Sequence, residues 1–204
     1  MKLRIPDLQS LENHLPSGTS QIIHKWIIEL KVDFVISKPR KTKLGDFRPA
    51  YGSKPARITV NGNLNPYHFL LTTIHEFAHL GCYLKHGNKV LPHGKEWKTI
   101  YTKLLEKHLD QGVFPQKLEP ALRKHLGRPS ASSCSDPGLF RSLSHFDNEP
   151  KLFLSQVPLN SLFSLHDTAY KVLEKRRTRY LCIRLEDRKK YLVSGNAVIQ
   201  RVEI

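Results

Sequence analysis

The stretch TTIHEFAHLGCYLKHGNKVLPHGKEWK, residues 72–98, holds four of the eleven histidines in this chain of 204 residues. Two of them, His75 and His79, bracket Glu76 in the pattern H-E-x-x-H. A helix turns by about 100° per residue, so these three side chains share one helical face. The opposite face carries apolar and small residues: Leu70, Ile74, Phe77, Ala78, Gly81 and Leu84. The pattern therefore predicts a helix that buries one side and presents a polar triad on the other.

The spacing of this triad is typical of a metal site. Side chains four residues apart lie one helical turn above another, which lets the imidazoles of His75 and His79 reach one ion at about 2.0–2.1 Å. Glu76 then points toward the open side of the ion, where it can act as general base for a water molecule. Zinc makes such a water acidic enough to lose its proton near neutral pH, and it polarises a carbonyl group. We therefore interpret this helix as the centre of a catalytic zinc site.

A catalytic zinc site needs a third protein ligand. His86 and His68 lie on the same helix but too far from the pair: at 1.5 Å per residue, His86 stands about 10 Å beyond His79. The ligand should therefore come from outside the helix. We favour His93, which the loop LPHGKEW can present, and keep Glu96 as the alternative.

Periodicity and capping residues place this helix among other helices and strands. Asn65 followed by Pro66 is typical of a helix start, and Gly87 of a helix end. Trp97 is interpreted as a core residue that anchors the next helix. The expected elements are a helix over 18–30, strands over 32–37, 43–52 and 56–62, the H-E-x-x-H helix, a helix over 94–111 and a short helix over 115–126. The expected fold class is therefore α+β, with a small antiparallel sheet.

The composition changes after residue 127. Residues 128–150 are rich in Ser, Pro and Asp and have little periodicity, which favours a linker. Beyond it, the stretches 179–185, 190–194 and 197–204 have strand character and are separated by turn residues. We therefore expect three parts: a domain over 1–127, a linker over 128–150 and a small basic antiparallel β domain over 151–204.

The chain is strongly basic. It has 33 Lys and Arg against 18 Asp and Glu, which gives a net charge of +15. Such an excess favours a polyanionic partner, above all a nucleic acid, with DNA as a possible partner. Basic clusters lie at 38–43, 174–179 and 186–190, the last two beside Tyr180 and Tyr191. These tyrosines are candidates for stacking on unpaired bases, and solvated hairpin tips are the alternative reading.

Other classes of protein are disfavoured. Cys82, Cys134 and Cys182 are odd in number, scattered and never in a C-x-x-C pair, so neither a disulfide framework nor a cysteine zinc site is expected. No apolar run approaches the roughly 20 residues that a membrane span needs, and the first residues do not have the pattern of an export signal. We expect a cytoplasmic protein without a membrane partner, and nucleoid association is a further hypothesis.

The sequence IHEFAHL (74–80), followed after a loop by PHGKEWK (92–98), resembles the SprT-like metalloprotease family. The approach to it, RITVNGNLNPYHFLLTTIHEFAH (57–79), resembles the strand-and-helix entry of the same domain. The similarity extends over roughly residues 18–125. An H-E-x-x-H pattern alone is common, but its combination with a later H-G-x-x-W is fairly specific.

The resemblance implies a zincin-like metalloprotease domain in which His75, His79 and His93 bind zinc and Glu76 is the general base. It also implies hydrolysis of peptide bonds in proteins bound or crosslinked to DNA. Many family members carry a cysteine zinc ribbon after this domain. The C-terminal region here has only Cys182, so it is expected to be a metal-free β unit.

Two hypotheses follow. The first is a zinc-dependent endopeptidase that acts on proteins near DNA, with ARITVNG (56–62) as the edge strand that pairs with a substrate strand. The second is a basic nucleic-acid-binding protein whose zinc site is structural or catalytically silent. Glu76 counts against the second, because a structural site does not need that carboxylate. Tyr83 falls on the metal-facing side of the helix and is interpreted as a packing or surface residue, so no residue is assigned to stabilise the oxyanion.

Overall fold

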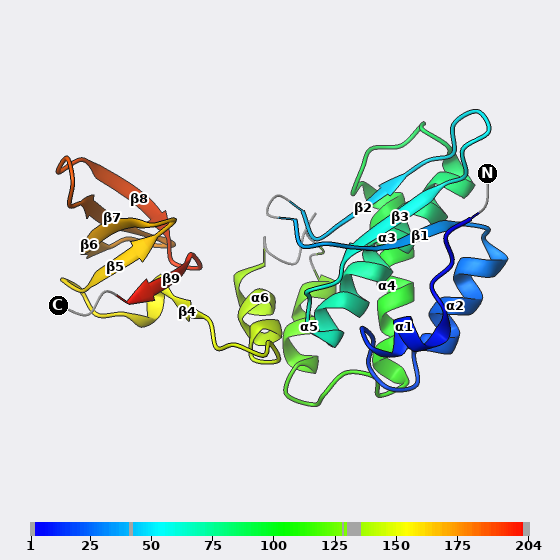
Figure 1. The fold of residues 1–204 in the computed structure, drawn as a ribbon, viewed down its shortest axis with the longest axis horizontal. Helices are drawn as coiled ribbons and strands as arrows, with labels where there is room; N and C mark the ends of the chain where they lie inside the picture. The colour runs from blue at the N-terminus through cyan, green and yellow to red at the C-terminus, as the bar shows by residue number, and fades with distance from the viewer. Residues whose placement is uncertain (1–2, 41–42, 128, 130–135, 202–204) are drawn as a thin grey trace. The chain divides into compact units, whose positions relative to one another are not determined.

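The fold was analysed in a computed structural model, which describes residues 3–40, 43–127, 129 and 136–201. The chain forms two compact units, Met1–Phe146 and Asp147–Ile204 (Figure 1). Cys134 and residues 202–204 lie outside the described residues. Within the described residues, no helix combines the length and the apolar character that crossing a membrane requires.

The first unit combines α-helices with one three-stranded sheet, which agrees with the expected α+β class. Its elements are α1 (Leu8–Glu12), α2 (Ser20–Glu29), β1 (Asp33–Ser37), β2 (Gly45–Arg48), β3 (Arg57–Asn61), α3 (Pro66–His86), α4 (Lys95–Asp110), α5 (Glu119–Gly127) and α6 (Pro137–Ser144). Helix α3 contacts β2 and β3 on one side and α4 on another, so it runs through the middle of the unit (Figure 1). The predicted helices and strands are all present, and most of their ends shift by one or two residues. The strand expected over 43–52 is shorter, the helix expected over 115–126 begins only at Glu119, and α1 was not predicted.

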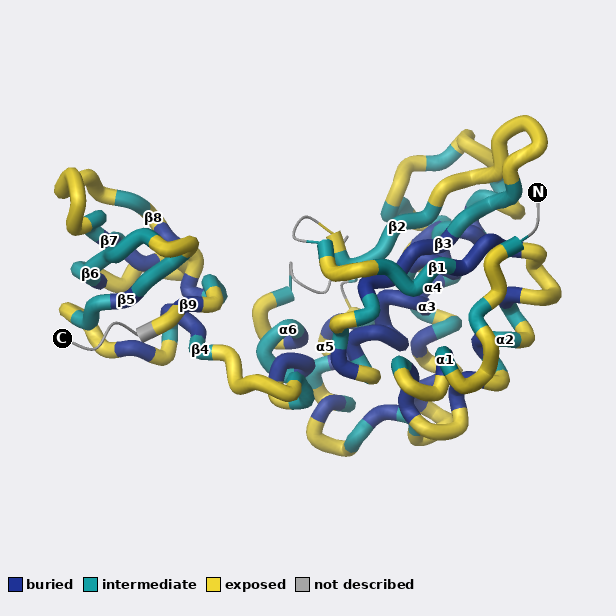
Figure 2. The backbone as a smooth tube through the Cα atoms, viewed as in Figure 1, coloured by how far each residue is buried: buried dark blue, intermediate teal, exposed yellow. Residues whose placement is uncertain are grey.

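Helix α3 carries the H-E-x-x-H pattern and is the best-buried helix of the unit (Figure 2). The Asn65 side chain caps it by accepting a hydrogen bond from the backbone N–H of His68 at 3.0 Å, and Pro66 occupies its first turn. Gly87 ends it with a φ of 59°. Leu84, expected on the buried face, is 59% exposed because the last turn of the helix extends beyond the core.

The sheet of the first unit is mixed, so the expectation of an antiparallel sheet is wrong. Its strand order is β1-β3-β2, with β1 parallel and β2 antiparallel to β3. Two arginines, Arg4 and Arg57, bind the buried carboxylate of Asp33, which joins the starts of the two parallel strands. Strand β3 is therefore central, and the expectation that ARITVNG (56–62) is an edge strand is also wrong. Among the described residues, β2 is the edge strand beside α3.

Part of the expected linker belongs to the first unit. Residues 137–144 form α6, whose Leu139 and Leu143 are buried in the core of that unit. The Asn65 side chain also donates a hydrogen bond to the carbonyl oxygen of Leu143 at 2.9 Å. The structure therefore differs from the expected linker because two leucines four residues apart give this short helix an apolar face.

The second unit is the expected antiparallel β unit. Its elements are β4 (Leu152–Phe153), the 3₁₀ helix η2 (Leu154–Gln156), β5 (Leu162–Leu165), β6 (Thr168–Lys175), β7 (Arg179–Arg184), β8 (Lys190–Ser194) and β9 (Val198–Arg201). Strands β5 to β8 form a meander, and β9 returns to pair with β5. Strands β4, β5 and β6 were not predicted. Tyr180 is only 5% exposed in the core, so it does not offer its ring to a nucleic-acid base.

Candidate metal centre

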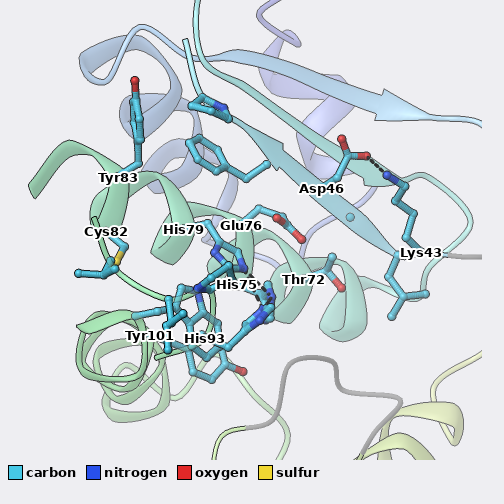
Figure 3. Close-up of a pocket in the computed structure, with 18 of the residues that line it drawn as sticks. Lys43, Asp46, Thr72, His75, Glu76, His79, Cys82, Tyr83, His93 and Tyr101 are labelled. Atoms are coloured by element: carbon cyan, nitrogen blue, oxygen red, sulfur yellow. Dashed lines mark hydrogen bonds and ion pairs between the residues drawn. The ribbon is translucent and has the colours of Figure 1, made fainter. Parts of the chain in front are cut away.

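Three histidine rings converge on one point in the first unit (Figure 3). The Nε2 atoms of His75 and His79 are 3.2 Å apart, and the Nε2 of His93 lies 3.0 Å from the first and 2.9 Å from the second. Within the described part of the chain, this is the one group of three metal-ligating side chains that meets a common point. His68, His86 and Glu96 do not belong to it.

A tight turn before α4 presents His93 to the other two histidines. The backbone N–H of Gly94 donates to the carbonyl oxygen of Leu91 at 3.0 Å, and His93 takes a φ of 57°. A Cβ atom at Gly94 would stand 2.9 Å from that carbonyl oxygen, so the turn leaves no room for a side chain there. The sequence P-H-G therefore places the imidazole of His93 directly before the start of α4.

Trp97 supports all three imidazoles from beneath. Its ring centroid lies 4.6 Å from that of His75, 5.3 Å from that of His79 and 4.7 Å from that of His93. The ring of Tyr101 stacks on Trp97 at 4.7 Å with an interplanar angle of 12°, and it also lies 5.8 Å from the ring of His75. Trp97 is fully buried, which confirms its interpretation as a core residue. The aromatic stack therefore fixes the orientations of the three rings.

Burial keeps the three imidazoles in the neutral form that binds metals. It lowers the pKa of His75 to about 2, and the neighbouring His79 and His93 add to this effect. Burial also lowers the pKa of His79 to about 4, and it lowers the pKa of His93. Each ring therefore offers a lone pair at neutral pH.

Glu76 lies beside the histidines and faces strand β2 (Figure 3). The side chain is 6% exposed, and burial raises its pKa to about 8. Asp46 contributes to this increase, while the charge of Arg40 and the backbone N–H of Phe47 lower the pKa. An ideal Cβ atom at Gly45 would lie 2.7 Å from Glu76 Oε1, so the strand and the carboxylate are in closest contact where the strand has no side chain.

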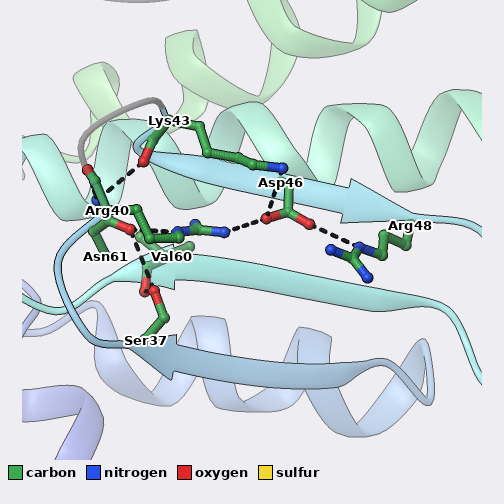
Figure 4. Close-up of polar contacts among 7 residues, drawn as sticks. All are labelled: Ser37, Arg40, Lys43, Asp46, Arg48, Val60 and Asn61. Atoms are coloured by element: carbon green, nitrogen blue, oxygen red, sulfur yellow. Dashed lines mark hydrogen bonds and ion pairs between the residues drawn. The ribbon is translucent and has the colours of Figure 1, made fainter.

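A polar network holds β2 in this place (Figure 4). Asp46 pairs with Arg40, with Lys43 at 3.6 Å and with Arg48 at 3.1 Å. The buried Asn61 of β3 donates from its amide to the carbonyl oxygens of Arg40 at 3.2 Å and Lys43 at 3.0 Å. Two residues of the connection between β1 and β2, Arg40 and Lys43, are thereby tied to the central strand, and the ion pairs position β2 against α3.

The three histidines and Glu76 line a cleft of about 730 Å³. One wall is β2 with its flanking residues, the floor is α3, and the other wall is the loop over 87–93. Tyr83 lies on the wall next to Phe47, with ring centroids 5.9 Å apart, and its hydroxyl points away from the histidines (Figure 3). It therefore is not placed to stabilise an oxyanion, in agreement with its interpretation as a packing residue.

Sequence reasoning missed the contribution of β2 to the site. A strand was expected there, but nothing local marked Gly45, Asp46 or Phe47 as neighbours of Glu76. The one available signal was a glycine within a short strand, which often marks the close approach of another group.

Comparison with known proteins is consistent with this geometry. The model of the SprT-like family matches residues 22–121. The matched region contains all three histidines, Glu76, Trp97 and the three strands of the first sheet. No curated protein and no solved structure matches the chain.

Proposed function

This chain belongs to the SprT-like family through residues 22–121, and from this premise we propose that it is a zinc-dependent endopeptidase. Family membership suggests a function related to metalloproteases. One observation carries the finer assignment: the buried carboxylate of Glu76 lies beside three converging histidines at the floor of an open cleft. A purely structural metal site needs neither a carboxylate outside the ligand set nor an open side.

The donor set of His75, His79 and His93 fits zinc. Two atoms that are each about 2.0–2.1 Å from one ion at a tetrahedral angle lie about 3.3–3.4 Å apart. The Nε2 atoms here are 2.9–3.2 Å apart, close to that spacing. Three histidines with one open position are a ligand set of catalytic zinc. When bound, zinc supplies Lewis-acid chemistry, which polarises the scissile carbonyl and makes water acidic near neutral pH.

Glu76 is the general base of the proposed reaction in its ionised form, which the positive charge of a zinc ion held by the neighbouring histidines would favour against the burial that raises its pKa. Its carboxylate takes a proton from the attacking water, whose oxygen bonds to the carbonyl carbon of the substrate. The carbon–nitrogen bond then breaks, and the departing amine receives the proton from Glu76. The packing of Glu76 between α3 and β2 holds the carboxylate in one place for both transfers.

The edge strand β2 is the proposed template for the substrate, in place of the strand expected from the sequence. The carbonyl oxygen of Leu44 accepts from the backbone N–H of Asn61 at 2.8 Å, so the backbone groups of Leu44 face β3. Pairing alternates in an antiparallel ladder, so those of Gly45 and Phe47 face the free edge, where the N–H of Phe47 is directed to Glu76 and the groups of Gly45 and the carbonyl of Phe47 remain for a peptide. A peptide in extended form can add to that edge above the histidines.

DNA-associated proteins are the proposed substrates, and a cytoplasmic, nucleoid-associated location follows from them. The support is the charge of +15 and the basic residue Lys43, which lines the cleft. In the second unit, Arg177 and Arg179 are exposed near the β6–β7 turn. Because Tyr180 is buried, the proposed contact with DNA in that unit rests on phosphate neutralisation.

The test is cleavage of casein and of a histone by the zinc-loaded protein, with and without single-stranded DNA. We expect cleavage by the wild type, and a loss of about 10²-fold or more in Glu76→Gln with zinc content unchanged. Stimulation by DNA supports the proposed substrate class. DNA binding without any cleavage would instead favour a nucleic-acid-binding protein with a catalytically silent zinc site.

A further inference from the structure

We propose that one side of the cleft selects a large apolar residue on the N-terminal side of the scissile peptide bond. This inference rests on the proposed endopeptidase function and names a substrate preference for the same site. The selecting surface, called the apolar wall below, consists of six residues: Phe47, Pro49, Tyr83, Val90, Leu91 and Pro92.

The cleft has two chemically different halves on either side of the histidines. The half toward the C-terminal end of α3 is lined by the apolar wall, together with Cys82, Gly87 and Asn88. The half toward its N-terminal part is lined by Lys43, Asp46 and Thr72, besides apolar residues. Apart from Glu76, the charged residues that line the cleft are Lys43 and Asp46, and both lie in this second half.

The apolar wall is continuous with the metal centre. The ring of Phe47 lies parallel to that of His79, with centroids 6.5 Å apart and an interplanar angle of 3°. The ring of Tyr83 also packs against Phe47, with centroids 5.9 Å apart. Leu91, two residues before His93, is 78% exposed although it faces a cleft. An exposed leucine beside a reaction centre gains from being covered by an apolar side chain of a bound peptide.

The direction of the substrate follows from the edge strand. Gly45 lies against Thr72 and Glu76, whereas Phe47 lies against His79 and Tyr83, so β2 runs from the polar half toward the apolar wall. A peptide that pairs antiparallel with β2 runs the opposite way. Its N-terminal part then lies along the apolar wall, and its C-terminal part lies toward Lys43.

The position of the general base agrees with this direction. The departing amine belongs to the C-terminal product, because the amide nitrogen of the broken bond is the first atom of that product. Glu76, which protonates this amine, lies toward the Gly45 end of β2. A parallel arrangement of the peptide would put the amine at the other end, next to Phe47. The position of Glu76 therefore favours the antiparallel arrangement, which places the apolar wall beside the residue before the scissile bond.

The experiment first identifies the bonds that the zinc-loaded wild type cleaves in casein by mass spectrometry. A peptide series built on one cleaved site then varies the residue before the bond among Phe, Leu, Ser and Glu. We expect kcat/KM for Phe or Leu to exceed that for Ser by on the order of tenfold or more. The same peptides, labelled with a fluorophore, should bind zinc-loaded Glu76→Gln in the same order of Kd, which measures selection without catalysis.

Two variants test the apolar wall, and a third variant is the matched control. Leu91→Ser and Tyr83→Ser should reduce the Phe-to-Ser preference several-fold at unchanged zinc content. Leu84→Ser changes a leucine on α3 that is 59% exposed and does not line the cleft, and it should keep the wild-type preference.

The outcomes separate this inference from the proposed function. Cleavage without preference at that position, or with the apolar preference after the scissile bond, overturns the inference and leaves the endopeptidase intact. An equal loss of preference in all three variants also overturns it, because the effect would then not come from the apolar wall. Absence of cleavage of every peptide by zinc-loaded wild type rejects both.

Discussion

Glu76 and Gly45 occupy the same small space from opposite sides: an ideal Cβ atom at Gly45 falls 2.7 Å from Glu76 Oε1. The same atom would lie 2.8 Å from Thr72 Cγ2, so a side chain at residue 45 would collide with both Glu76 and Thr72. The distance between β2 and α3 thus depends on the absence of a side chain at one residue. The carboxylate proposed as general base is held by that close approach.

Gly45→Ala should therefore impair catalysis without removing the metal. The added methyl group must displace either Glu76 or β2, and a displacement of about 1 Å at a catalytic group costs on the order of 10²-fold in rate. The measurement is kcat for casein peptides together with zinc per chain. Gly127→Ala is the control, because a Cβ atom there meets nothing within 4 Å. Wild-type kcat in Gly45→Ala would show that the carboxylate does not depend on this contact.

The central helix could be predicted because its information is local. Asn65 and Pro66 start α3, Gly87 ends it, and the H-E-x-x-H spacing fixes which side chains share a face. The third histidine required more: its side chain reaches the others only because a turn at Gly94 lifts His93 over α3. The P-H-G sequence indicated such a loop, but the distances come from the tertiary packing of Trp97.

The role of β2 could not be predicted, because strand neighbours are set by long-range pairing. Alternation in the sequence 56–62 indicated a strand, but not that it would lie between two others. Tyr180 shows the same limit. Its neighbours Arg179 and Leu181 turn the other way along β7, so the alternation buries Tyr180 next to Cys182 in the core of the second unit. Nearby basic residues had favoured an exposed ring.

Removal of one histidine tests the third ligand. His93→Ala should bind far less zinc than the wild-type content of about one per chain, because two imidazoles alone do not complete a zinc site. Zinc at 100 times its Kd should also stabilise the wild type by about 2.7 kcal/mol, and this gain should disappear in the variant. The measurements are metal analysis and thermal unfolding with and without zinc. His86→Ala is the control, and it should keep its zinc. Retention of zinc by His93→Ala would move the third ligand to Glu96.

Trp97 should link the stability of the first unit to the metal centre. Trp97→Ala removes a fully buried ring that touches three histidines and Tyr101, and such truncations cost about 3–5 kcal/mol. Trp97→Phe keeps an aromatic face and should cost less. Urea unfolding measures both losses, and zinc titration should show weaker binding in the order wild type, Phe, Ala. Equal zinc affinity in folded Trp97→Phe and wild type would argue against a positioning role.

Asp33 is a buried acid whose partners predict a pH dependence of stability. The side-chain hydrogen bond from Arg4 is the largest cause of a pKa lowered from 3.8 to about 2, and Arg57 adds a second hydrogen bond at 2.7 Å. The folded state therefore favours the carboxylate more than the unfolded chain does. The resulting stability is fully present above the unfolded pKa near 3.8 and is lost as the pH falls through about 2.

Asp33→Asn should accordingly lower the free energy of unfolding at pH 7 by about 2 kcal/mol or more, since a shift of one pKa unit corresponds to about 1.4 kcal/mol. The difference between variant and wild type should narrow as the pH falls from 4 toward 2, because the wild-type carboxylate is then protonated as well. Urea unfolding at several pH values measures this. Asp110→Asn, at the exposed end of α4, should show no such narrowing. A stability difference that stays constant from pH 7 to 2.5 would mean that the arginines stabilise the sheet through packing of their stems and not through the charge of Asp33.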